Sequence, residues 1–369
     1  MLISRALAFV RYFGTFLLIW VAGVLAAEGA FRLIGDTPSN DLDGLYMQFG
    51  DRSYKHRPLV TTGAKWSTGP FSVYTDKLGL RCDKDLKFGA TPGENVDVLF
   101  IGDSQGFGNG VNYEQTIAGT VAQLATNRVI RNCSVGGHHA PNQFELVRWL
   151  RNEQNIKVSK YIYLLTPVGI ASCDNPTRAR VGEDGHLYGE GSTRPWDLAR
   201  IWIKTHSVSY GRVRDAVRSQ GIGVEADDKS SFVYRLYRAG AVEEQNRRKW
   251  VDFIKQFQAF AQRDHASIEF VYMPLTLEMN FDSIQKAAEK SGNSVDVEAP
   301  YRILAGAARE MNIPLHDLRP VLRELYKAGK PLSLLPDFHY TGAVSSACGR
   351  NVWEDLAPSV RTIAKQLEN

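Results

Sequence analysis

The stretch VDVLFIGDSQGFGNGV, residues 96–111, decides how this sequence is interpreted. Residues 96–101 are apolar apart from Asp97, which is typical of a buried strand. The apolar run stops at Gly-Asp-Ser, whose serine is Ser104, and three further glycines follow. A loop of this composition either cradles a phosphate or presents a nucleophile.

The known phosphate-binding motifs fit these glycines poorly. A dinucleotide fingerprint has G-x-G-x-x-G at the start of a helix, and a P-loop has G-x-x-x-x-G-K-[ST]. Here the glycines stand at positions 102, 106, 108 and 110, and no lysine followed by Ser or Thr completes a P-loop. The nucleophile interpretation is therefore favoured.

A serine nucleophile needs a base that takes its proton and a third group that orients the base. Ser104 stands at the end of the predicted strand, and the candidate base is His339 in PDFHYTG. Asp337 lies two residues earlier, and residues i and i+2 of an extended backbone point the same way. We therefore expect Asp337 to orient the His339 ring. Glycines near the serine suit backbone N–H donors for an oxyanion.

Strand-like and helix-like segments alternate from residue 96 onward. The strand-like segments are 96–101, 128–135, 160–167, 267–274 and 313–318. The helix-like segments are 114–125, 141–151, 250–260, 300–311 and 341–367. This alternation predicts an α/β fold with three layers, α/β/α, around a mainly parallel sheet. Ligands bind at the carboxyl ends of the strands in such sheets, where the loops GDSQGFGNG, VGGHHAPNQ and LLPDFHYTGA fall.

The N-terminus carries a predicted transmembrane helix. Residues 12–27 are uncharged and mostly apolar, and the stretch lengthens toward the roughly 20 residues of a spanning helix if Arg11 snorkels. Arg5 and Arg11 precede the stretch and acidic residues follow it, which predicts a cytoplasmic N-terminus and an exported remainder. A cleaved signal peptide is the alternative. A helical pattern that continues to residue 34 favours a retained anchor.

These patterns divide the chain into three parts. Residues 1–35 are the predicted membrane anchor, 36–95 a juxtamembrane segment, and 96–369 the main domain. The alternation of strand-like and helix-like segments is interrupted over about 174–247, and we interpret this stretch as an insertion in the main domain.

Composition argues against several classes of partner and cofactor. A net charge of +4 over 369 residues, without a basic run that contains aromatics, makes nucleic acid a poor candidate. No spacing of Cys and His predicts a metal site, no cofactor is expected, and the adjacent His138 and His139 are interpreted as loop residues. The four cysteines allow three complete disulfide pairings in an oxidising compartment, and buried thiols or one bridge are expected.

Three blocks of this sequence resemble a known family. FIGDSQGFGNGV, NCSVGGHHAPNQ and LPDFHYTGAVSSACG are similar, in this order, to the first, second and last blocks of SGNH (GDSL-type) esterases. The similarity covers about residues 75–369. Glu28 and Arg32 also resemble a pair that follows the span in membrane-anchored bacterial members. This implies a flavodoxin-like sheet and a single-pass protein of the inner membrane that faces the periplasm.

The resemblance also implies roles for individual residues. Ser104 would be the nucleophile, His339 the base and Asp337 its orienting acid, with the N–H groups of Ser104 and Gly137 as the oxyanion hole. No metal or other cofactor is implied.

One block departs from the family. After the third strand the family has Gly-x-Asn-Asp, whereas this chain reads LLTPVGIASCDN, with Val168 and Gly169 at the place of Asn-Asp. The side-chain donor of the oxyanion hole is either missing or supplied from elsewhere, with Asn175 as the candidate. Losing such a donor can cost about 10²–10³ in rate.

The resemblance to SGNH esterases, together with this departure, leaves three possible functions. The first is an esterase that acts on an acyl ester, such as the O-acetyl groups of a cell-envelope carbohydrate, through a Ser-His-Asp triad and an acyl-enzyme. The second is an O-acyltransferase that modifies an envelope glycan. The third is a catalytically degenerate domain that binds a glycan or a partner.

Overall fold

The structure is a computed structural model that describes most of the chain. The described residues are 2–34, 42, 44–51, 53–66, 69–182, 187–189, 203, 207–210, 212–213, 236–238, 240–282, 285–286, 289, 295–334 and 338–367. The chain divides into two compact units. The anchor unit is Met1–Asp41 with Gly191–Val224, and the main unit is Leu42–Glu190 with Glu225–Asn369.

The anchor unit contains the long helix α1 (Leu2–Leu33). Its part Arg11–Leu33 has 23 residues and a mean hydropathy of 1.7, and it is long and apolar enough to cross a membrane. An N-terminal signal sequence has a similar length and composition. The helix is therefore compatible with both the predicted anchor and the alternative of a cleaved signal.

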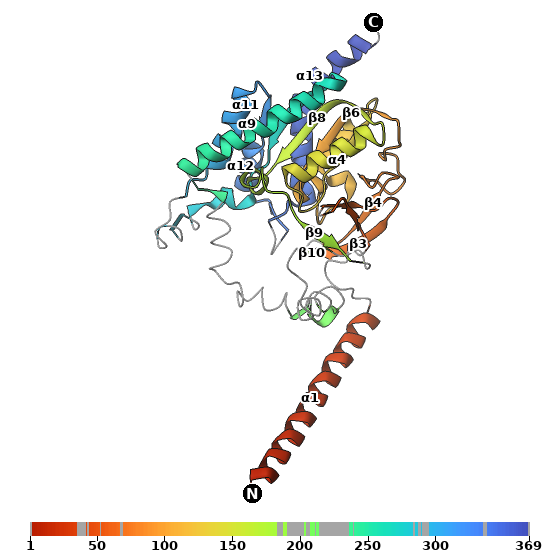
Figure 1. Ribbon diagram of the computed structural model, residues 1–369, viewed down its shortest axis with the longest axis vertical. Coiled ribbons are helices and arrows are strands. Elements are labelled where there is room, and N and C mark those ends of the chain that lie inside the picture. Colours follow the sequence, from red (N-terminus) through yellow and green to blue (C-terminus); the bar gives the residue numbers. More distant parts are fainter. Residues whose placement is uncertain are drawn as a thin grey trace. The chain divides into compact units, whose positions relative to one another are not determined.

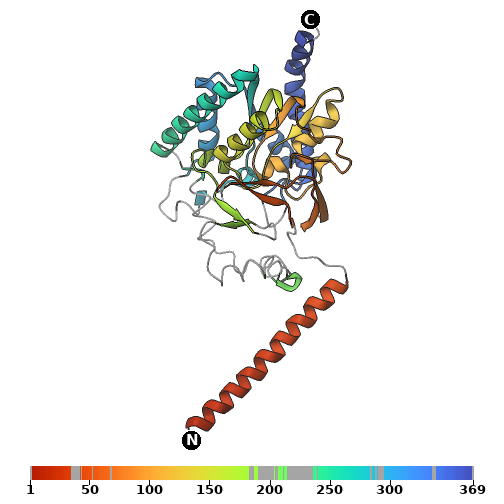
Figure 2. The same ribbon diagram turned by 45° about the vertical axis from the view of Figure 1, so that its right-hand side comes forward.

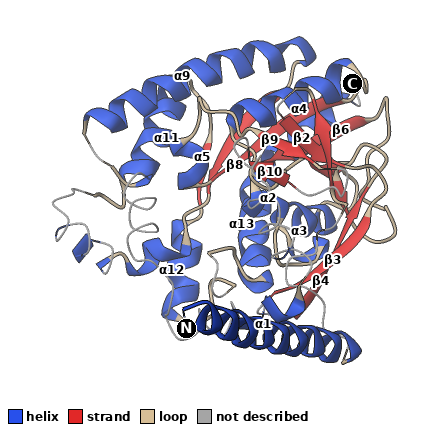
Figure 3. Cartoon of the chain, turned by 60° about the horizontal axis from the view of Figure 1, so that its bottom comes forward, coloured by secondary structure: helices blue, strands red, loops and turns tan. Residues whose placement is uncertain are grey.

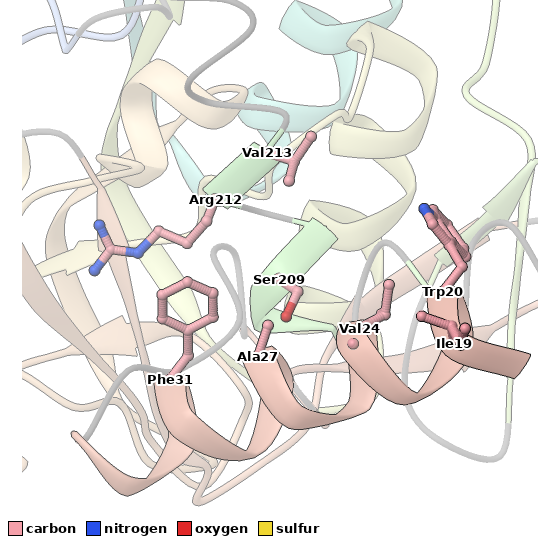
Figure 4. Close-up of a pocket in the computed structure, with 9 residues that line it drawn as sticks. Ile19, Trp20, Val24, Ala27, Phe31, Ser209, Arg212 and Val213 are labelled. Atoms are coloured by element: carbon pink, nitrogen blue, oxygen red, sulfur yellow. The ribbon is translucent and has the colours of Figure 1, made fainter. Parts of the chain in front are cut away.

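Glu28 joins a second segment of the anchor unit to α1. Its carboxylate accepts hydrogen bonds from the Ser207 hydroxyl at 3.0 Å and from the N–H groups of Val208 and Ser209 at 3.1 and 2.9 Å. The carboxylate thereby satisfies N–H groups that have no partner at the start of a helical turn. Next to it lies a hollow of about 570 Å³, lined mainly by Ile19, Trp20, Val24, Ala27, Phe31 and Val213 (Figure 4).

The main unit is built on an eight-stranded sheet with the strand order β12-β11-β8-β6-β7-β5-β4-β3 (Figure 1). The strands are β3 (Thr61–Trp66), β4 (Gly69–Thr75), β5 (Arg81–Cys82), β6 (Asn95–Ile101), β7 (Ile130–Asn132), β8 (Lys157–Leu165), β11 (Ser267–Tyr272) and β12 (Leu315–Asp317). The five strands from β12 to β7 are parallel. Taken in chain order they give the flavodoxin-like arrangement 2-1-3-4-5, so the predicted sheet is confirmed.

Helices cover both faces of the sheet, which confirms the predicted three layers (Figure 3). One face packs against α4 (Ala140–Asn152), α9 (Ala241–Ala261) and α11 (Ala299–Glu310). The other packs against α3 (Ile117–Leu124), α12 (Arg319–Lys327) and α13 (Gly342–Leu367). Shorter elements are α2 (Ser104–Phe107), α5 (Pro167–Ala171), η1 (Tyr113–Gln115), η2 (Gln262–Asp264) and η3 (Thr276–Asn280).

Strand β6 shows why the opening stretch has no polar face. Leu99 and Ile101 are buried on the α4 side, whereas Val98 and Phe100 are buried on the α3 side. A parallel strand covered on both faces has a nearly continuous apolar sequence. The order of the strands reverses between β6 and β8, and Ser104 follows β6 at this switch point.

The segment 36–95 differs from the prediction of a juxtamembrane stretch. It contributes β3, β4 and β5, which extend the main sheet by antiparallel pairing. In β4 only Phe71, Val73 and Thr75 are buried, with more exposed residues between them. Such short strands with alternating burial give a weak apolar signal in the sequence, so the main unit begins well before residue 96.

Two antiparallel pairs lie outside the main sheet, next to each other (Figure 2). They are β1 (Tyr46–Phe49) with β2 (Ser53–His56), and β9 (Ala179–Val181) with β10 (Leu187–Gly189). The N–H of Val181 donates to Gln48 Oε1 at 3.0 Å and joins the pairs. The second pair belongs to the predicted insertion 174–247, most of which lies outside the described residues.

A buried arginine fixes the loop that follows α2. Arg81 on β5 is fully buried, and its guanidinium donates to the carbonyl groups of Phe107, Gly108 and Val111. The guanidinium carbon also lies 4.4 Å from the centre of the Phe107 ring. Burial lowers the pKa of Arg81 to about 10, which leaves it charged at neutral pH. Hydrogen bonds from a charged, buried donor are stronger than neutral ones.

We predict that Arg81→Met destabilises the protein strongly, because three buried carbonyl groups lose their donor at once. The free energy of unfolding should fall by about 3 kcal/mol or more. Chemical denaturation of the full chain in detergent measures it. Arg248→Met is the control, since its side chain is 75% exposed and its ion pair contributes less than about 1 kcal/mol. Equal losses in both variants would contradict this view of Arg81.

Candidate functional site

The Ser104 loop lies at the carboxyl end of β6, and Asp103 shapes it. Asp103 Oδ1 accepts a hydrogen bond from the N–H of Gln105 at 2.9 Å, which caps α2. Its other oxygen, Oδ2, accepts from Thr166 Oγ1 at 2.6 Å. Thr166 follows β8, so the two sides of the switch point are joined by one carboxylate.

The structure brings His339 to Ser104 across 235 positions of sequence. The distance from Ser104 Oγ to His339 Nε2 is 2.7 Å, and His339 is only 7% exposed. In this geometry the hydroxyl donates and the imidazole nitrogen accepts when Nε2 carries no proton. Two of the three predicted triad residues thus meet, while Asp337 lies outside the described residues.

Gln105 holds the backbone on both sides of His339. Its Nε2 donates to the carbonyl of Phe338 at 2.9 Å, and its Oε1 accepts from the N–H of Tyr340 at 3.2 Å. Gln105 is itself buried. The residue next to Ser104 is therefore bonded to both neighbours of His339, which couples the positions of the two side chains.

The Gly136–Gly137 peptide lies beside Ser104, and Tyr54 determines its orientation. The Tyr54 hydroxyl donates to the carbonyl of Gly136 at 2.9 Å. Because a trans peptide is planar, the N–H of Gly137 points away from that carbonyl. Gly137 has φ +78°, and a Cβ there would lie 2.6 Å from Tyr54 Oη, so only glycine fits. Among the described residues, neither this N–H nor that of Ser104 has a hydrogen-bond partner.

Two buried histidines lie behind this peptide. His138 Nε2 donates to the carbonyl of Tyr54 at 2.7 Å, and the Tyr54 and His138 rings are 4.8 Å apart. Burial lowers the pKa of His138 to about 3 and that of His56 to about 3. Both are neutral at physiological pH, and His138 supports the tyrosine that orients the Gly136–Gly137 peptide.

The segment after β8, where SGNH esterases have Gly-x-Asn-Asp, carries Val168 and Gly169 instead and provides no side-chain donor at those two positions. Val168 packs against a small apolar cluster made of Leu236, Tyr237, Leu275 and Phe281. Asn175 is exposed, and its backbone carbonyl accepts from His139 Nδ1 at 2.8 Å. The proposal that Asn175 serves as an oxyanion donor stays a prediction.

Two residues of the site give no signal of their own in the sequence. Tyr54 and Thr166 form hydrogen bonds with groups far away in the chain. Gln105 could have been predicted as a site residue from the sequence, because it directly follows Ser104.

All four cysteines, Cys82, Cys133, Cys173 and Cys348, are buried free thiols. Within the described ranges, no group of three or more His, Cys, Asp and Glu side chains is arranged to hold a metal ion.

Comparison with known proteins gives solved structures only. No family profile matches the chain, and no curated protein sequence does. One match is a member of the lipolytic protein G-D-S-L family from Veillonella parvula, with 12% identity, 70% of this chain and 97% of that chain covered, and a TM-score of 0.37.

Two further matches are acetylxylan esterases. The first, from Geobacillus stearothermophilus, is 11% identical, with 72% of this chain and 95% of that chain covered and a TM-score of 0.38. The second, AlAXEase, is 12% identical, with 71% of this chain and 100% of that chain covered and a TM-score of 0.39.

We predict that His138 makes the folded state sensitive to acid. An unfolded histidine takes up a proton near pH 6.5, whereas His138 in the folded protein does so only near pH 3. Between these values the unfolded state binds more protons, so stability falls as the pH drops, by about 2 kcal/mol at pH 5 for one such group. Urea unfolding at pH 7 and pH 5 should show a smaller loss in His138→Gln than in the natural chain. An identical loss in both proteins would refute this assignment.

We predict that Gln105→Leu increases local opening of the backbone around His339. The substitution removes the side-chain hydrogen bonds to residues 338 and 340, while the leucine side chain has nearly the volume of the glutamine side chain. Hydrogen–deuterium exchange of peptides that contain the Tyr340 amide should become faster. Gln143→Leu is the matched control, since Gln143 is also buried but donates to the carbonyl of His138. The idea fails if exchange around Tyr340 stays unchanged in Gln105→Leu.

Proposed function

We propose that this protein is a serine esterase in which Ser104 is the nucleophile and His339 is the general base. The observation that carries the proposal is the 2.7 Å contact between Ser104 Oγ and His339 Nε2 at the switch point of a parallel sheet. Ligands bind at this place in open α/β sheets. A hydroxyl within hydrogen-bond reach of an imidazole can be activated as a nucleophile.

The reaction uses the proton that Ser104 shares with His339. As Ser104 Oγ attacks the ester carbonyl carbon, its proton passes to His339 Nε2, and the carbonyl oxygen becomes an oxyanion. The N–H groups of Ser104 and Gly137 donate to that oxyanion. The imidazolium then protonates the leaving alcohol, and an acyl-enzyme remains. His339 then deprotonates a water molecule that attacks the acyl carbonyl carbon, and the imidazolium returns that proton to Ser104 Oγ as the bond to the serine breaks and the carboxylic acid leaves. We assign to Asp337 the orientation of the imidazole.

The proposed substrate is an acyl ester outside the cytoplasm. The positive charges before the apolar stretch of α1 and the acidic residues after it favour a main unit on the periplasmic side of a bacterial inner membrane. An esterase held there meets the glycans of the cell envelope, so an O-acetyl group on such a carbohydrate is the substrate that we propose.

We predict that a fluorophosphonate probe labels Ser104 alone, because phosphonylation requires an activated serine. The natural chain and Ser346→Ala, a control on α13, should be labelled, whereas Ser104→Ala should not. His339→Ala should turn over an acetyl ester about 10⁴-fold more slowly or worse, since the serine loses its base. Labelling that persists in Ser104→Ala would overturn the assignment, and absence of labelling from the natural chain would favour a binding domain.

Hydrolysis and transfer are distinguished by the fate of the acyl group. An acetyl ester is supplied with and without an oligosaccharide acceptor, and both free acetate and acetylated sugar are measured. An esterase releases acetate at the same rate in both reactions. Acetylated sugar formed at the expense of acetate would instead identify an O-acyltransferase that uses the same serine.

A further inference from the structure

A small gap separates Gly136 from Ser104, and two polar side chains border it. A Cβ built on Gly136 would lie 3.8 Å from Ser104 Cβ, 3.4 Å from Tyr46 Oη and 3.9 Å from Asn109 Nδ2, and these are its nearest atoms. Because glycine leaves this position empty, the amide of Asn109 faces the space directly beside the serine. That space also adjoins the Gly136–Gly137 peptide described above.

The Asn109 amide is oriented with its nitrogen toward this gap. Its carbonyl oxygen, Oδ1, is buried and has no hydrogen-bond partner among the described residues. No hydrogen bond from Nδ2 is found within the described ranges either. The end of the side chain that faces the gap is therefore a neutral N–H donor that is available for a ligand.

The backbone holds Asn109 at a fixed place relative to Ser104. The N–H of Asn109 donates to the carbonyl of Ser104 at 3.1 Å. The preceding residue, Gly108, is in the left-handed conformation with φ +83°. Arg81 binds the carbonyl groups on both sides of Asn109 in the loop. A donor on a loop fixed in this way needs little reorganisation when charge develops.

We propose that Asn109 Nδ2 is the side-chain donor of the oxyanion hole, acting with the N–H groups of Ser104 and Gly137. This inference rests on the proposed esterase function. It supplies the side-chain donor that is lacking after β8, where Val168 packs against an apolar cluster and has no polar side-chain group. It also replaces Asn175, which is exposed and contacts His139 through its backbone carbonyl.

The second polar group at the gap, the Tyr46 hydroxyl, bounds the site but is not the donor in this account. Burial raises the pKa of Tyr46 to about 12, so the hydroxyl stays neutral. The Tyr46 hydroxyl can donate or accept a hydrogen bond, whereas Asn109 Nδ2, which lies at the same gap, can only donate. Tyr46→Phe therefore serves as a comparison for Asn109→Ala.

The test is steady-state hydrolysis of p-nitrophenyl acetate by the full chain in detergent. Asn109→Ala should lower kcat about 10²–10³-fold and leave KM within a few-fold, because the lost donor acts on the transition state. Asn109→Asp should be at least as slow, since a carboxylate repels the oxyanion. Asn175→Ala and Tyr46→Phe should keep most of the turnover. Inhibition by a phenylboronic acid, which mimics the tetrahedral intermediate, should weaken in parallel with kcat/KM in Asn109→Ala.

The outcomes separate this inference from the proposed function. If the natural chain neither hydrolyses the ester nor reacts with a fluorophosphonate, the esterase proposal fails, and this inference fails with it. If the natural chain is active and Asn109→Ala matches it, only the role of Asn109 is refuted. A loss of kcat in Asn175→Ala or Tyr46→Phe, without one in Asn109→Ala, would also refute it.

A second variant keeps the inference testable if Asn109→Ala does not fold. Gly136→Ala places a methyl group in the gap at distances of 3.4–3.9 Å from its neighbours, which are ordinary contacts. We expect a normal melting temperature and a loss of kcat, because the methyl group separates Asn109 from the oxyanion. Unchanged kcat in a folded Gly136→Ala protein would count against the assignment.

Discussion

The hydrogen bond between Ser104 Oγ and His339 Nε2 joins the two loops that form the candidate site. It joins the end of β6 to a loop just before α13, and its length is 2.7 Å. Such a contact is made only if the parallel sheet brings both loops to the same edge. The Gln105 side chain then fixes the His339 backbone from the residue beside the serine. The geometry of the site is therefore a property of the fold and of one buried amide.

The part of the chain before β6 completes the site. β5 supplies Arg81, which binds three carbonyl groups of the loop after α2, and β2 supplies Tyr54, which binds the Gly136 carbonyl. Both side chains are buried and act on backbone groups whose orientation decides where N–H donors point. The same segment carries Tyr46, at the border of the gap beside Ser104. Residues before the three sequence blocks, namely Tyr46, Tyr54 and Arg81, thus support or border the residues of the blocks that surround the serine.

The sequence predicted the central layer well because its strands are buried on both faces. β6, β8 and β11 are mostly apolar, and their order along the chain leads directly to a parallel sheet. The buried residues Lys160 and Glu269, which pair with each other across β8 and β11, are exceptions. The pairing of Ser104 with His339 was predicted from residue types and from their places at strand ends. The short strands of residues 46–82 were missed, since burial of every second residue over so few positions resembles a loop. The partners of Arg81, Tyr54 and Asn109 are backbone groups or open space, which no local pattern reveals.

Detection of the acyl group on the serine tests most directly whether His339 activates Ser104. The protein is mixed with p-nitrophenyl acetate, quenched in acid during turnover, digested and analysed by mass spectrometry. The peptide that contains Ser104 should be acetylated during turnover, and acetylated Ser104 should not accumulate in His339→Ala. Turnover without acetyl-Ser104, or acetylation that is equally fast without the imidazole, would contradict the claim that His339 activates Ser104.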